Sequence, residues 1–488
     1  MSPGELLNHP GRRQSPRFHV RSTPSTQASF TIVLILLLVC GWPASNAAAQ
    51  AQGPLYIVEA GDTLSAIART FGVSVEDLAA ANGITDPSTI FPGQQLVIPG
   101  YPGVAGVLQT QEVAYGDTLR SAAIRQGVRQ QTLARLNRVV NPNWLYVGQP
   151  LIVPEQGDAP PALPQSIGAW AAEGQSMLEL AAEHGLSAWD LQTQNHMGYR
   201  LWSLPAERLF LPGGAAATQA LPTGVTRVTL KPLPVAQGHT LEMQLELSRT
   251  LWVEASLGAR ELRPVSIGDG QLLALQGIHA LAPPGLEDLV IRLFDASGGP
   301  LLDQFSQPLP IRSGDYGSEA LRVPAETLDP ANTGPEDALI ESLVNQTRPE
   351  KLWDGVFQFP TTYFETFPSL FGTRRSYNGS DYSYYHTGLD LYGSTQTQVL
   401  APARGVVVYA GFLTVRGNVT YIDHGWGVFS GFLHQSQIQV RPGDAVTPGQ
   451  VIGYVGGTGR VTGPHLHWEV WVGGVPVDPR EWTVSVFP

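Results

Sequence analysis

The chain has 488 residues, 43% of them hydrophobic, and a net charge of −12 from 29 basic and 41 acidic side chains. This length suggests several domains. The acidic balance argues against nucleic acid as a partner, because phosphate binding needs clustered cations. With Cys40 as its one cysteine, the chain has no disulfide scaffold or cysteine-based zinc site, so a metal would have to use His, Asp or Glu.

The N-terminus has the pattern of an export signal. Four arginines between residues 12 and 21 precede an apolar run from 30 to 39, and the small residues 47–49 follow. This order predicts a signal peptide over 1–49. A membrane anchor is the weaker alternative, since spanning a bilayer takes roughly 20 apolar residues. We therefore expect a protein of the cell wall or periplasm, with no stable membrane insertion after cleavage.

Three related segments follow the signal. GDTL stands at 61–64 and 116–119, and the endings PGQQLVIP (92–99) and VGQPLIVP (147–154) keep the same offset. A worn third copy matches the first without a gap, down to its ending RLFLP (208–212). Each copy is predicted as strand, helix, helix, strand, because a short β-rich run precedes apolar residues at helical spacing.

These segments resemble the LysM module, a small domain that recognises N-acetylglucosamine chains in peptidoglycan and chitin. The resemblance is specific for copies one (54–100) and two (111–155) and degenerate for copy three (167–213), which can be a spacer. It implies glycan binding at the GDT loops, which are Gly61, Asp62, Thr63 and Gly116, Asp117, Thr118. The alternative is that GDT is only a turn and a helix cap.

The middle of the chain has the residue alternation of β-strands and no motif that indicates catalysis or metal binding. Leu241, Met243, Leu245 and Leu247 alternate with polar residues, the pattern of a half-buried strand. Several short strands with Pro and Gly turns predict an Ig-like β-sandwich over 220–313. Residues 314–350 are predicted as a linker that carries one helix near 336–344.

Histidines are enriched in the C-terminal part, in a stretch dominated by β signals. His386 and Asp390 lie four residues apart in HTGLD, where the glycine favours a turn leading into a strand. His465 and His467 lie two apart, so on a strand both imidazoles face one cavity. Imidazole and carboxylate are both zinc ligands. Each motif alone is weak, and only their order and context give them weight.

The C-terminal part contains the motifs HTGLD (386–390), APARGVVVYAG (401–411), YIDHGWG (421–427), GQVIGYVGGTGR (449–460) and TGPHLHWEV (462–470). Together these motifs resemble the lysostaphin-type zinc endopeptidases of bacterial cell walls. The resemblance covers residues 351–488 and implies one Zn²⁺ per chain, with His386, Asp390 and His467 as ligands. It makes His465 the general base, and His434 a group that holds the water or stabilises the oxyanion. The division of labour between these two histidines stays open.

Other residues near these motifs are less decisive. The resemblance gives His424 no ligand role, so we interpret it as structural. A tyrosine before the first ligand often assists the oxyanion in this family, and Tyr382, Tyr384 and Tyr385 are all candidates. Arginines 374, 375 and 460 can meet carboxylates of a stem peptide, although single arginines on a surface are common.

The sequence thus predicts a multidomain α+β and all-β protein: LysM (βααβ) repeats, an Ig-like sandwich and a β-rich peptidase domain of the duplicated hybrid motif type. The predicted function is a secreted zinc peptidoglycan endopeptidase that cuts stem or cross-bridge peptides while LysM repeats hold the glycan. The alternative is a catalytically inactive activator of cell-wall amidases. That alternative is disfavoured, because relatives of that kind lose the zinc ligands and this chain keeps all three.

Overall fold

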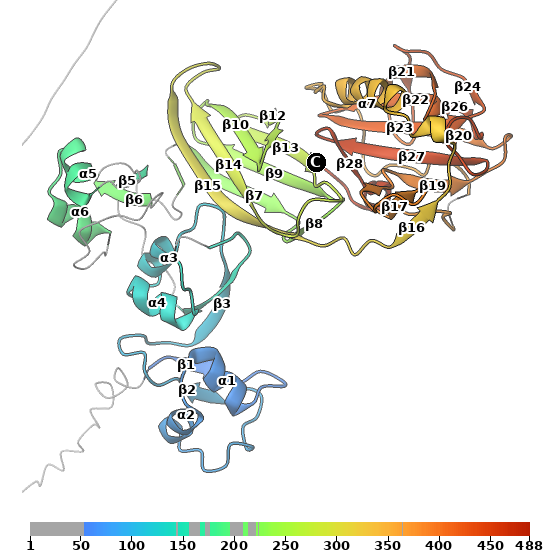
Figure 1. The fold of residues 1–488 in the computed structure, drawn as a ribbon. Helices are drawn as coiled ribbons and strands as arrows, with labels where there is room; N and C mark the ends of the chain where they lie inside the picture. Colours follow the sequence, from blue (N-terminus) through green and yellow to red (C-terminus); the bar gives the residue numbers. More distant parts are fainter. Residues whose placement is uncertain are drawn as a thin grey trace, which may run out of the picture. The chain divides into compact units, whose positions relative to one another are not determined.

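A computed structural model describes residues 53–142, 145–155, 166–170, 176–195, 208–212, 221–222, 224–363 and 365–488 (Figure 1). The predicted signal peptide and Cys40 lie outside these residues. Within the described part of the chain, no helix combines the length and the apolar character needed to cross a membrane.

Each of the three repeats forms a two-stranded antiparallel ladder that encloses two short helices. The elements are β1 (Leu55–Ile57), α1 (Leu64–Phe71), α2 (Val75–Ala81) and β2 (Gln95–Val97); β3 (Leu108–Glu112), α3 (Leu119–Arg125), α4 (Gln130–Leu136) and β4 (Pro150–Pro154); β5 (Ser166–Trp170), α5 (Met177–Glu183), α6 (Ala188–Gln194) and β6 (Arg208–Pro212). In the first repeat, Thr63 caps α1 by accepting from the Ala66 amide, and Gly72 ends the helix in a left-handed conformation.

One asparagine fastens the second helix of each repeat to the closing strand. The Asn82 side chain donates to the carbonyl oxygens of Leu78 and Val97, each at 2.8 Å, and accepts from the Val97 amide at 2.7 Å. Asn137 and Asn195 make the same three bonds in the second and third repeats. The third copy therefore keeps the fold although its sequence has lost the GDT loop.

Two antiparallel sheets form the middle of the chain. Their strand orders are β11-β10-β14-β15-β8 and β12-β13-β9-β7, with the short β8 parallel to β15. The strands are β7 (Val225–Lys231), β8 (Val235–Ala236), β9 (Thr240–Leu247), β10 (Trp252–Leu257), β11 (Arg260–Leu262), β12 (Val265–Gly268), β13 (Gln271–Gly277), β14 (Gly285–Phe294) and β15 (Leu301–Arg312). Alternate residues of β9, Leu241, Met243 and Leu245, are buried in the core of these sheets.

The C-terminal domain is built on a seven-stranded antiparallel sheet of order β19-β27-β23-β22-β21-β25, with β28 also paired to β27 (Figure 1). Its strands are β19 (Leu389–Tyr392), β21 (Gly405–Leu413), β22 (Gly417–Gly425), β23 (Val428–Gln435), β25 (Ala445–Val446), β27 (His465–Val472) and β28 (Val475–Val477). The other elements are β17 (Arg374–Tyr377), β18 (Tyr384–Tyr385), β20 (Gln398–Leu400), β24 (Gln437–Ile438), β26 (Val451–Tyr454) and α8 (Pro479–Val484). One core face of this sheet buries Leu466, Trp468 and Val470 of β27.

The segment between the two β-rich parts is structured. It contains β16 (Ser318–Leu321), η2 (Ala325–Thr327) and α7 (Pro330–Val344). β16 pairs in parallel with β17, and α7 buries Ile340 and Val344 against strands of the large sheet. The predicted helix near 336–344 is thus the second half of α7, and the whole segment packs on the C-terminal domain.

Candidate metal centre

Two neighbouring strands carry the three side chains that the sequence predicts as metal ligands. Asp390 on β19 lies directly opposite His467 on β27 in the antiparallel ladder. His386 precedes β19, and Gly388 makes the turn between His386 and the strand. A Cβ atom added at Gly388 would lie 2.3 Å from the Trp468 carbonyl oxygen and 2.8 Å from His467 Nε2. Glycine is therefore required where the HTGLD loop passes close to β27.

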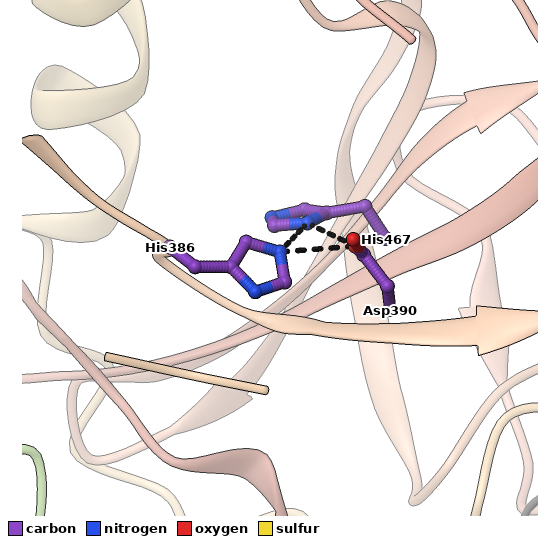
Figure 2. A group of neighbouring side chains, drawn as sticks. All are labelled: His386, Asp390 and His467. Atoms are coloured by element: carbon purple, nitrogen blue, oxygen red, sulfur yellow. Dashed lines mark hydrogen bonds and ion pairs between the residues drawn. The ribbon is translucent and has the colours of Figure 1, made fainter. Parts of the chain in front are cut away.

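The three side chains converge on one point in the interior (Figure 2). His386 Nε2 lies 3.0 Å from Asp390 Oδ1 and 2.8 Å from His467 Nδ1, and His467 Nδ1 lies 2.9 Å from Asp390 Oδ1. All three residues are buried, with at most 6% of their surface exposed. Two imidazole nitrogens and one carboxylate oxygen are the donor set of a catalytic zinc site with an open position.

The outer hydrogen bonds of both imidazoles fix which nitrogen faces the centre. His386 Nδ1 donates to the Leu370 carbonyl oxygen at 2.9 Å, which leaves Nε2 as a lone pair. His467 Nε2 lies 3.2 Å from Glu469 Oε1 and donates to it, which leaves Nδ1 as a lone pair. Two lone pairs and a carboxylate oxygen thus face each other within 3.0 Å, an arrangement that a cation stabilises. The residues present fit a bound metal ion.

The electrostatics of the cluster favour a neutral His386 and an ionised Asp390. Burial lowers the pKa of His386, which keeps its imidazole neutral at neutral pH. Burial alone would lower the pKa of His467 as well, but the hydrogen bonds to Asp390 and Glu469 and their negative charges outweigh burial and raise it. Burial opposes ionisation of Asp390, but the adjacent His386 and His467 outweigh it and hold the pKa of Asp390 well below its usual value. Arg375 Nη2 lies 3.7 Å from the other carboxylate oxygen, Oδ2.

Glu469 supports the cluster from behind, and the sequence analysis gave it no role. Besides facing His467, its carboxylate accepts from Thr387 Oγ1 at 2.6 Å, Tyr421 Oη at 2.7 Å and Trp471 Nε1 at 2.8 Å. Burial alone would raise the pKa of Glu469, yet the contact with His467 above all lowers it to about 2. Glu469 lies two residues after His467 on β27, so the alternation of that strand was the signal that could have revealed it.

His434 and His465 lie beside the cluster, and each is held through Nδ1 by a backbone carbonyl. His434 Nδ1 donates to the Thr458 carbonyl oxygen and His465 Nδ1 to the Gly463 carbonyl oxygen, both at 2.8 Å. His465 Nε2 lies 3.6 Å from Asp390 Oδ1. Burial lowers the pKa of His434 to about 3, so this imidazole is neutral. His434 also has a φ of 65°, a strained backbone conformation of the kind found at functional sites.

A cavity of about 310 Å³ opens beside the metal centre. Its walls include His434 and His467, and also Tyr384 and Tyr385 of β18. Among the three candidate tyrosines, Tyr382 is not part of these walls, and 49% of it is exposed. Of the three candidates, Tyr384 and Tyr385 therefore line the cavity beside the metal centre, as does Tyr377.

His424 lies in the interior, away from the cluster, with both ring nitrogens engaged. Its Nδ1 donates to the Arg404 carbonyl oxygen at 2.9 Å, and its Nε2 accepts from the Ser430 hydroxyl at 3.0 Å. The ring packs on Phe357 with centroids 4.8 Å apart. These contacts hold β22 and β23 together, so the geometry is that of a structural histidine.

His424 makes the stability of the domain depend on pH. Burial lowers its pKa to about 4, whereas the unfolded chain has the ordinary value of about 6.5. Below pH 6.5 the unfolded state gains a proton that the folded state does not, so this contribution is complete above pH 6.5 and is lost as the pH falls towards 4. We expect a loss of about 3 kcal/mol in unfolding free energy from this group.

Urea unfolding near pH 7 and near pH 4.5 checks this, with a His424→Gln variant that carries no titrating group at the same site. The variant is expected to be less stable than the wild type near pH 7 and to have a flatter pH dependence. Equal losses of stability in both proteins between the two pH values would contradict the assignment.

The two GDT loops differ in their surroundings. In the first repeat, Gly61 and Thr63 are exposed, and Asp62 accepts from Tyr56 Oη at 2.8 Å. In the second repeat, Asp117 is buried and pairs with Arg125 at 2.7 Å. The backbone of this second loop also bonds to the middle β part, since the Gly116 amide donates to Gln307 Oε1 at 2.6 Å. Thr118 forms a capping box on α3.

Family comparisons agree with the fold and the site. A model of peptidase family M23 matches residues 384–479, and a model of the LysM domain matches 56–99 and 112–154. The chain therefore carries a peptidase M23 domain and two LysM domains. The predicted resemblance to lysostaphin-type peptidases with LysM repeats is confirmed.

The chain is similar to two curated proteins over this region. Peptidoglycan DD-endopeptidase ShyC of Vibrio cholerae is 38% identical over 117 residues, which are 24% of this chain and 27% of that protein. DD-carboxypeptidase/endopeptidase Mpg of Neisseria meningitidis is 44% identical over 94 residues, 19% of this chain and 22% of that protein. The match thus spans about a quarter of the length of these relatives.

The chain is also similar to a solved structure whose description is a peptidase M23 from Pseudomonas aeruginosa. It is 25% identical, covers 52% of this chain and 96% of its own, and gives a TM-score of 0.39.

Proposed function

We propose that the protein is a secreted, zinc-dependent peptidoglycan endopeptidase that hydrolyses a peptide bond of the stem or cross-bridge peptides. The observation that carries this proposal is the buried convergence of His386, Asp390 and His467, with His434 and His465 beside it, each held through Nδ1 by a backbone carbonyl. The M23 domain and the similarity to enzymes named peptidoglycan DD-endopeptidases support the reaction and the substrate class.

In this proposal, His386, Asp390 and His467 would hold one Zn²⁺. When bound, zinc lowers the pKa of a water molecule to about 7 and polarises a carbonyl group. His465 takes a proton from the attacking water and returns it to the leaving amine. His434 has its one N–H committed to the Thr458 carbonyl, so its Nε2 accepts a hydrogen bond and orients that water.

The remaining domains hold the enzyme on its substrate. The LysM domains bind N-acetylglucosamine-containing strands of peptidoglycan, and attachment raises the local concentration of peptide at the catalytic groove. Repeat one has the more accessible loop, with Gly61, Asp62 and Thr63 as contacts; in repeat two the equivalents are Gly116, Asp117 and Thr118. The two central sheets serve as an Ig-like spacer, and the signal over 1–49 directs export to the cell envelope.

The test is zinc content and product analysis with residues 50–488 on purified peptidoglycan. We expect about one zinc per chain and new peptide ends whose masses identify the cleaved bond. His465→Ala is the matched control, because it removes the proposed base and leaves the three ligands in place. Zinc bound by both proteins, with product from the wild type alone, would support the proposal. A protein without zinc and without product would instead be the inactive amidase activator.

A further inference from the structure

Helix α7 packs on the large sheet of the C-terminal domain, beside β22 and β23 (Figure 1). In the β23–β27 ladder Leu433 is paired with His467, so these side chains share one face, and Phe429 lies on the same face four residues earlier. Ile340 and Val344 of α7 are buried in one cluster with Leu433 and Phe429. The helix therefore covers the surface that continues from the metal ligands across the sheet.

Just before the α7 residues that cover the sheet, the acidic pair Glu336 and Asp337 is bonded to Arg416. Glu336 is buried, and its carboxylate accepts from the backbone amides of Val415 at 2.8 Å and Arg416 at 3.3 Å. The Arg416 guanidinium bonds to Glu336 at 3.3 Å and to Asp337 at 2.8 Å. The carbonyl of Arg416 accepts from the His434 amide at 3.0 Å, so this arginine adjoins the catalytic histidine.

A second arginine is engaged by the same segment. Arg460 Nη1 donates to the Thr327 carbonyl oxygen at 3.2 Å. Arg416 and Arg460 line the cavity beside the metal centre together with Arg375, and Asp337 of α7 is also part of the wall. Arg375 is bonded to Glu319 at 2.7 Å. A cavity lined by arginines next to a peptide-cleaving centre fits a carboxylate of the substrate, because guanidinium groups bind carboxylates with charge-assisted bonds.

The sequence of α7 divides it into a weak and an anchored half. Gly334 and Pro335 lie inside the helix, where glycine is flexible and proline removes a backbone bond. The residues that follow bury apolar side chains on the sheet. The start of α7, beside the cavity, is therefore weakly stabilised, while its end is firmly attached to the sheet. Glu336 and Asp337 can thus leave Arg416 while the end of the helix stays bound.

We propose that Arg416 and Arg460 form a subsite for a carboxylate of the substrate peptide, and that Asp337 and Glu336 hold Arg416 in this subsite until substrate displaces them. The inference rests on the proposed function for the identity of the peptide. It goes beyond that function by naming carboxylates as ligands of the cavity beside the metal centre, and by making α7 compete with the substrate for Arg416.

The test measures binding in the His465→Ala background, so that turnover does not interfere. The probes are cross-linked muropeptides with free carboxylates and the same muropeptides with those carboxylates amidated. Combining Glu336→Gln with Asp337→Asn is expected to tighten binding of the free-carboxylate probe by about tenfold, as when a competing occupant filling nine-tenths of the sites is removed. The amidated probe gains far less, and adding Arg460→Gln cancels the gain.

Glu341→Gln, in an exposed part of the same helix, is the matched control and leaves binding unchanged. Asp337→Asn alone, whose side chain is 65% exposed, is the milder variant if the double substitution unfolds the domain. Unchanged affinity, no measurable binding by any variant, or equal gains for both probes would overturn the inference. With His465 restored, failure of every variant to cleave peptidoglycan would reject the proposed function, while the binding result still decides the subsite.

Discussion

Replacing His386 by alanine is expected to abolish metal binding and to reduce peptide hydrolysis by roughly a thousandfold or more. His386 supplies one of three donor atoms that lie within 3.0 Å of each other, and its Nδ1 bond to Leu370 fixes the orientation of the ring. Two remaining donors cannot hold zinc against water in a site built for three. Zinc content by atomic absorption and initial rates on purified peptidoglycan check this.

His184→Ala is the matched control, since this histidine is exposed in the third repeat and has no part in the centre. It is expected to keep both the metal and the rate. A His386→Ala protein that still contained one zinc per chain would remove His386 from the ligand set.

Replacing Glu469 by leucine is expected to weaken zinc binding by about 10–100-fold, the usual effect of losing a partner that orients a ligand. Four donors lose their acceptor, on His467, Thr387, Tyr421 and Trp471. Because buried unpaired donors each cost about 1–3 kcal/mol, the domain also loses at least about 2 kcal/mol of unfolding free energy. Glu469→Gln keeps an acceptor oxygen and should show the smaller loss in both quantities.

Zinc affinity by competition with a chelator separates this orienting role from simple loss of stability. Glu481 of α8 offers a matched carboxylate, because it accepts from the Thr240 amide at 2.9 Å and faces His239 Nδ1 at 3.2 Å. Glu481→Gln is expected to lower stability and leave zinc affinity unchanged. If Glu469→Leu behaved in the same way, Glu469 would be a structural residue only.

The parts of the molecule that local sequence describes were predicted well. Helix caps such as Thr63 and the recurring asparagines mark each repeat, since a cap bonds within a few residues of itself. The HTGLD and HLH words placed His386, Asp390 and His467 as candidates because a turn and a strand fix where neighbouring side chains point. The Ig-like nature of the two central sheets remains a prediction.

Contacts between distant parts of the chain could not be predicted in the same way. Glu469 acquires its role from Thr387, in the loop before β19, and from Tyr421 on β22. Glu336 meets Arg416 across 80 positions, and Gly116 meets Gln307 across 191. The periodicity of hydrophobic residues in a short stretch of sequence does not predict such pairings, because they depend on which surfaces meet once the sheets have formed.

The position of β27 has a consequence for how this enzyme can change over time. The strand is hydrogen-bonded on both sides, to β19 and β23, and carries His465, His467 and Glu469 on one face. A substitution that shifted β27 would break its pairing with β19 and β23 and displace His465, His467 and Glu469 at the same time. Such a substitution would abolish activity rather than change which bond is cut. New substrate preferences can therefore arise only in segments that touch the groove without belonging to the sheet, such as α7 and the loop before β27.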